Sequence, residues 1–146
     1  MTVQDSAAAV AMVFSLSLAA VQGVDDFVAR TFPPPIEGAG QVEGPVVAGD
    51  VAMVSWTITK RTECPGENWR VWSGEAGFSM SEPAGPTTLP TSIEPRTYRI
   101  PTQIPDQAPP GDLQLRIVGH YQCIGSPRVN WELGPVEFTV IEEDQQ

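Results

Sequence analysis

The feature that most constrains the fold is an alternating segment that follows two prolines and a Gly-Asp pair at residues 109–112. Apolar and polar side chains alternate in it, which is the pattern of a strand with one buried face and one wetter face. The expected buried side carries Leu113, Leu115, Ile117, Gly119, Tyr121 and Cys123, and the wetter side carries Gln114, Arg116, His120 and Gln122. Because one-sided burial is typical of antiparallel sheets, the pattern predicts a central strand of such a sheet.

Prolines and glycines extend this expectation to the rest of the domain. The 146 residues include 15 prolines and 13 glycines, which interrupt the chain too often for long helices after its N-terminal segment. Further short strands are expected at residues 46–47, 51–60, 69–73, 78–80, 96–100, 129–131 and 136–141. About seven short strands with frequent turns predict a mainly β fold, an antiparallel sandwich of two sheets. A closed barrel is the alternative.

Composition divides the chain into four parts. Residues 1–31 contain a hydrophobic segment that we expect to be an α-helix, and residues 32–43 form a Pro/Gly-rich linker. The sandwich is expected over residues 44–141, and residues 142–146 form an acidic tail that water should solvate. The length therefore predicts one globular domain, since domains of about 100 to 150 residues are the commonest.

The N-terminal segment contains eighteen residues without a charge, 7–24, and is the one candidate for a membrane-spanning helix. Small residues lie four apart along it, a spacing that favours close helix packing and self-association. These residues are Ala7, Ala11, Ser15, Ala19 and Gly23. Three hypotheses stay open: a membrane anchor, a helix that packs against other protein in an assembly, and a cleaved signal peptide.

The two cysteines of the chain, Cys64 and Cys123, are expected to form a disulfide. The bond would close a loop of about 60 residues and contribute about 4 kcal/mol in the chain-entropy model. Because disulfides persist in oxidising compartments, the bond predicts that the sandwich lies outside the cytoplasm. Together with the hydrophobic helix, it predicts a single-pass membrane protein with an extracytoplasmic domain; a virion component is the alternative.

Three features of the chain resemble the immunoglobulin-like family. A tryptophan-containing strand comes early, at Trp56 or Trp69, and the Pro-x-Gly-x-Leu-x-Leu run of residues 109–115 leads into a strand that ends in Tyr121-x-Cys123. An alternating strand closes the domain at its C-terminal end. The resemblance covers residues 44–141 and implies an immunoglobulin-like sandwich.

The cysteine positions depart from the antibody-type domains of that family, in which the paired cysteines sit mid-strand in the core. Here Cys64 lies in a loop and Cys123 at the exit of the central strand. Their bond would therefore connect two segments at one end of the sandwich. The plan of hydrophobic start, proline spacer and small sandwich also resembles compact proteins that tailed bacteriophages encode.

Charge and reactive residues argue against several classes of function. Eighteen acidic and eight basic residues give a net charge of −10 without a basic cluster, so nucleic-acid binding is not expected. A nucleophile needs a base, and the single histidine, His120, should face away from Cys123 within one strand. Ligands for zinc are too few, and no calcium-loop spacing occurs. We therefore expect no enzyme, no metal and no cofactor.

A protein-binding surface is the remaining expectation. Arg70 and Trp72 are predicted to point outward from one strand, while Arg128 and Trp131 lie near the loop after Cys123. With His120, they would gather at the disulfide end as a patch of the residue types that binding surfaces favour. The alternative is that the tryptophans belong to the core.

These observations predict a non-enzymatic, helix-anchored extracytoplasmic module for protein interaction or spacing. The first alternative is a structural subunit of an assembly such as a phage virion, with the helix packed against other protein. The second is a secreted carbohydrate-binding domain that uses Trp72 and Trp131.

Overall fold

A computed structural model describes residues 34–85 and 89–142 of the chain. The expected N-terminal helix, with its row of small residues, and most of the acidic tail lie outside these described residues. Within the described ranges, no helix has the length and apolar character needed to cross a membrane.

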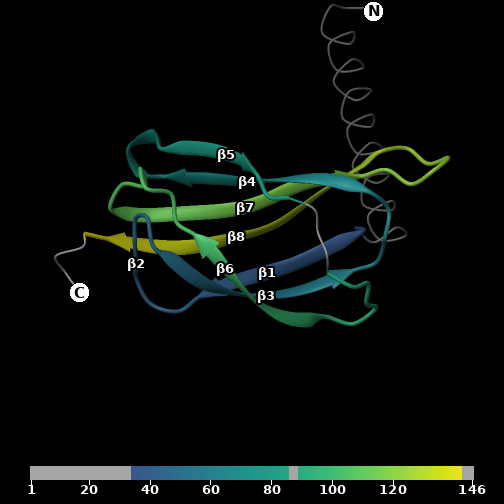
Figure 1. Cartoon of the computed structure of the whole chain (residues 1–146), viewed down its shortest axis with the longest axis horizontal. Coiled ribbons are helices and arrows are strands. Elements are labelled where there is room, and N and C mark those ends of the chain that lie inside the picture. Colours follow the sequence, from purple (N-terminus) through teal and green to yellow (C-terminus); the bar gives the residue numbers. More distant parts are fainter. Residues whose placement is uncertain (1–33, 86–88, 143–146) are drawn as a thin grey trace, which may run out of the picture. The chain divides into compact units, whose positions relative to one another are not determined.

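Eight strands and one short helical turn make up the described part of the chain. They are β1 (Ile36–Val42), β2 (Val46–Val47), β3 (Val51–Lys60), β4 (Gly66–Gly74), η1 (Glu75–Gly77), β5 (Ser79–Pro83), β6 (Arg96–Gln103), β7 (Gly111–Tyr121) and β8 (Val129–Ile141). The strands form a three-stranded sheet, β1-β3-β6, and a five-stranded sheet, β2-β8-β7-β4-β5. Figure 1 shows β4, β7 and β8 in one layer and β1 and β3 in the other. The predicted mainly β fold with two sheets is confirmed.

Strand β7 lies at the centre of the five-stranded sheet, where β8 and β4 pair with it on either side, both antiparallel. Its residues Leu113, Leu115 and Tyr121 are buried, as the alternation predicted. Strand β3 buries Trp56 toward the same core from the other sheet. The alternating segments thus supply the two inner faces of the sandwich, and their burial is the main stabilising contribution.

The linker expected at residues 32–43 is wrong over most of its length. All of Ile36–Val42 pairs with β3 as strand β1, and the compact unit begins at Pro35. The glycines that suggested flexibility are required for packing instead, since a Cβ on Gly40 would lie 2.5 Å from Cγ2 of Val136. Close approach of the two layers explains the glycine here.

Residues 129–141 form one strand, where the sequence suggested two separate segments. The register between β7 and β8 shifts at Leu115 and Ile117, which lie opposite Val136 and Leu133. This bulge takes up one additional residue of β8, because Gly134 and Pro135 lie opposite the single residue Arg116, and the φ of Gly134 is +101°. Pairing therefore continues on both sides of the Gly-Pro step.

The predicted disulfide is present and joins Cys64 to Cys123, with Cα atoms 5.0 Å apart. Cys64 lies in the loop between β3 and β4, and Cys123 follows the end of β7. The bond therefore connects segments 59 residues apart at one end of the sandwich, as expected from the sequence.

Candidate functional site

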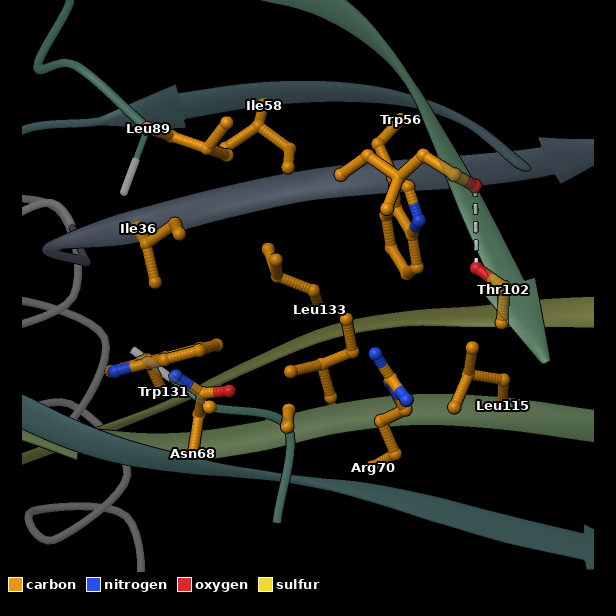
Figure 2. A pocket seen from close by; sticks show the side chains of 14 residues that line it. Ile36, Trp56, Ile58, Asn68, Arg70, Leu89, Thr102, Leu115, Trp131 and Leu133 are labelled. Atoms are coloured by element: carbon orange, nitrogen blue, oxygen red, sulfur yellow. Dashed lines mark hydrogen bonds between the residues drawn. The ribbon is translucent and has the colours of Figure 1, made fainter. Parts of the chain in front are cut away.

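Strand β4 presents its side chains the other way round from the prediction. Trp72 has 0% of its surface exposed and packs on Phe138, with ring centroids 5.6 Å apart. Arg70 lies on the same side of β4 and points between the sheets toward Trp56 (Figure 2). The outward orientation predicted for these two residues is wrong.

A carboxylate from the neighbouring strand helps to explain why the fold tolerates an arginine on the inner face of β4. Oε1 of Glu82, on β5, lies 3.5 Å from Nη1 of Arg70 and accepts a hydrogen bond from Nε1 of Trp72 at 3.4 Å. The Arg70 side chain stays 29% exposed, and the counter-charge offsets part of the cost of partly removing its guanidinium from water. Glu82 is twelve residues from Arg70 in sequence, so the periodicity of β4 alone cannot reveal this pairing.

Trp131 also belongs to the core rather than to a free surface. It is 7% exposed and stacks on Tyr121, with ring centroids 5.6 Å apart. Gly119 makes room for its ring, because a Cβ there would lie 2.6 Å from Cζ2 of Trp131. The carbohydrate-binding hypothesis uses Trp72 and Trp131 as exposed stacking residues, and both are buried.

The structure does bring two of the predicted partner-binding residues together. Nη2 of Arg128 donates a hydrogen bond to Nδ1 of His120, at 2.6 Å. A guanidinium has no acceptor, so the imidazole nitrogen accepts this bond. The His120 ring in turn stacks on Trp69, with centroids 6.0 Å apart and planes 29° apart.

These residues form what we call the Trp69 patch, on the outer face of the five-stranded sheet. Its members are Trp69 of β4, Val118 and His120 of β7, Arg128 of the following loop and Glu132 of β8. Trp69 lies opposite Val118, and Val118 lies opposite Glu132, so these three form one row across the sheet. Nη1 of Arg116 lies 3.6 Å from Oε1 of Glu132 at the border of the patch.

Sequence reasoning missed Trp69 as a surface residue. Strand β4 reads Trp-Arg-Val-Trp over residues 69–72, with a tryptophan on each face, so alternation does not decide which face is buried. The charge of Arg70 indicates that its side of the strand faces outward, and the burial of Trp72 on that side shows that this indication is misleading. His120 is the more useful signal for this face. The alternation of β7 predicts that His120 lies on the wetter face, and Trp69 stacks on it there.

The Trp69 patch combines an indole, an imidazole and a guanidinium with an adjacent carboxylate, a combination suited to contacts with a protein surface. Among the described residues, no three His, Cys, Asp or Glu side chains are grouped as a metal ion would require. In comparisons with known proteins, no family model matches the chain, and no curated protein or solved structure is significantly similar to it.

Proposed function

We propose that residues 35–141 form an immunoglobulin-like module that binds a protein partner through the Trp69 patch. The strand order supports the fold part of this proposal. In immunoglobulin-like sandwiches, the third, sixth and seventh strands form one sheet, and the first, second and fifth lie in the other. Here β4, β7 and β8 correspond to the third, sixth and seventh strands and are neighbours in one sheet. Strands β1, β3 and β6 correspond to the first, second and fifth and form the other sheet.

The stacked pair of Trp69 and His120 carries the binding part of the proposal. Tryptophan and arginine are the residue types most enriched at the energetic centres of protein interfaces. Trp69 is held by the imidazole beside it, and His120 is held by Arg128. Side chains that are already ordered lose less conformational entropy when a partner binds, which favours affinity.

The disulfide supports an extracytoplasmic location for this module, because such a bond persists outside reducing compartments. We propose that residues 1–31 anchor it there as a helix, either in a membrane or against other protein of an assembly. The module itself would then have no enzymatic activity and would serve recognition or spacing.

Site-specific photo-crosslinking in the native host tests the binding surface. A photoreactive amino acid replaces Val118, inside the Trp69 patch, and in a matched chain it replaces Thr57, an exposed residue of β3 in the other sheet. We expect a discrete protein adduct from position 118 and none from position 57. Adding Arg128→Ala should reduce the adduct at position 118 severalfold. Equal adducts from both positions, or none from position 118, would contradict the proposal.

A further inference from the structure

A cavity lies between the two sheets, on the opposite side of β4 and β7 from the Trp69 patch (Figure 2). Side chains of the described residues line a partly open cavity with a volume of about 220 Å³. Trp56, Ile58 and Ile100 line it from the three-stranded sheet, and Leu115 and Leu133 from the five-stranded sheet. Its wall is therefore mostly apolar. Such a wall favours a ligand whose body is apolar.

Asn68, Arg70 and Thr102 are polar residues of this wall, and Arg70 is the one among the described lining residues that carries a charge. Figure 2 shows its guanidinium directed from β4 toward Trp56 and Leu133. Within the described residues, its one hydrogen-bond partner is Glu82, at 3.5 Å from Nη1. A guanidinium carries five N–H donors, so most of them remain for a ligand.

Glu82 neutralises the charge of Arg70 only in part, so the guanidinium would bind an anionic group. The Glu82 side chain is 38% exposed, and its contact with Arg70 is long, so water screens much of this pairing. The Arg70 side chain is 29% exposed, so its guanidinium is only partly removed from water. A partly buried guanidinium binds a carboxylate best through two parallel hydrogen bonds, a geometry that a single carboxylate oxygen at 3.5 Å does not supply.

We propose that this cavity binds a small apolar monocarboxylate, with its carboxylate on Arg70 and its body against Trp56, Leu115 and Leu133. A cavity of about 150 Å³ accommodates benzene, so a volume near 220 Å³ accommodates about nine non-hydrogen atoms. Benzoate has this size and charge and serves as the probe. Glu82 is then a competing anion for the same guanidinium.

Calorimetric titration of the full-length chain with benzoate tests the site. We expect saturable binding to one site, with affinity at least tenfold lower for benzyl alcohol, which has the same ring and no charge. Arg70→Met keeps an apolar stem and should weaken benzoate binding at least tenfold, the loss of a charge-assisted hydrogen bond. Glu82→Gln removes the competing anion and should strengthen binding.

Arg116→Met is the matched control, because Arg116 also pairs with one glutamate, at 3.6 Å, but on the outer face of the sheet. It should leave the affinity for benzoate unchanged. Ile117→Phe fills part of the cavity and should abolish binding, which keeps the proposal testable if Arg70→Met does not fold. Absence of saturable benzoate binding, equal affinity for benzyl alcohol, or affinity for benzoate unchanged by Arg70→Met or by Ile117→Phe would overturn the proposal.

Discussion

The indole of Trp69 stacks on the imidazole of His120 outside the five-stranded sheet, with ring centroids 6.0 Å apart. Trp72, on the same strand, is fully buried on the opposite face. Strand β4 therefore uses one tryptophan for the outer surface and one for the core. Which tryptophan serves which purpose follows from the register with β7, where Trp69 lies opposite Val118 and Trp72 opposite Leu115.

Alanine substitutions should separate the two tryptophans by their effect on stability. Trp72→Ala leaves a cavity in the core and should lower the free energy of unfolding by about 3 to 5 kcal/mol. Trp69→Ala removes a partly exposed ring and should lower the free energy of unfolding by about 1 kcal/mol or less. Urea denaturation of both variants measures the difference. The reverse order of stabilities would show that β4 faces the other way.

Alternation predicted the strands whose two faces differ clearly. Val51–Lys60 was expected as a strand and forms β3 with the same bounds, because one face is consistently more apolar than the other. The segment around Leu113 and Tyr121 was predicted for the same reason. In both strands, local sequence carries the information about burial.

The misassigned segments depend on contacts between residues distant in sequence. Arg70 lies inward because it shares a face of β4 with the fully buried Trp72, and Glu82, on the neighbouring strand, supplies a counter-charge there. Gly40 belongs to a strand because Val136 and Trp56 approach its backbone, yet in the sequence it resembles part of a flexible linker. Such tertiary contacts override local propensity, so neither the Trp69 patch nor the inter-sheet cavity could be predicted completely.

Removal of the disulfide should lower stability without altering the sheets. The bond closes a segment with a sequence separation of 59. In the chain-entropy model, replacing Cys64 and Cys123 with alanine should lower the free energy of unfolding by about 4 kcal/mol. Urea denaturation with and without a reductant measures this loss. Reductant should destabilise the natural chain and leave the double variant unchanged; equal sensitivity of both chains would contradict the bond.

Lys60 should anchor the segment that precedes β6. Its Nζ donates to the backbone oxygen of Leu89 at 2.7 Å, and its own backbone oxygen accepts from the N–H of Ser92 at 2.8 Å. Lys60 is only 4% exposed, so the first hydrogen bond is shielded from water. Lys60→Met should lower the free energy of unfolding by about 1.5 to 3 kcal/mol, the range for a hydrogen bond that involves a charged group.

Hydrogen exchange and denaturation measure this effect of Lys60→Met. The Ser92 amide should exchange faster in the variant than in the natural chain, because the segment around it loses its side-chain attachment. Arg96→Met is the control, since Arg96 is an exposed basic residue on β6. A surface change of this kind should alter stability by less than about 0.5 kcal/mol. Equal effects of the two substitutions would argue against the anchoring role of Lys60.

Glu63 should make stability depend on pH in the acid range. The backbone N–H of Thr91 donates to its Oε1 at 3.0 Å, and Nζ of Lys60 lies 3.4 Å from its Oε2. The hydrogen bond from Thr91, followed by the charge of Lys60, lowers the pKa of Glu63 below its ordinary value of 4.5. Because the folded-state pKa is lower than the unfolded one, the carboxylate stabilises the fold above pH 4.5.

This stabilisation is lost as the pH falls from 4.5 through the folded-state pKa, where the carboxylate takes up a proton in both states. Glu63→Gln keeps an oxygen that can accept from Thr91 but removes the charge. The natural chain should therefore exceed the variant in stability at neutral pH, and the difference should shrink in acid. Urea denaturation at about pH 7 and about pH 3 measures it. A difference that stays constant between these two conditions would mean that the charge of Glu63 does not stabilise the fold.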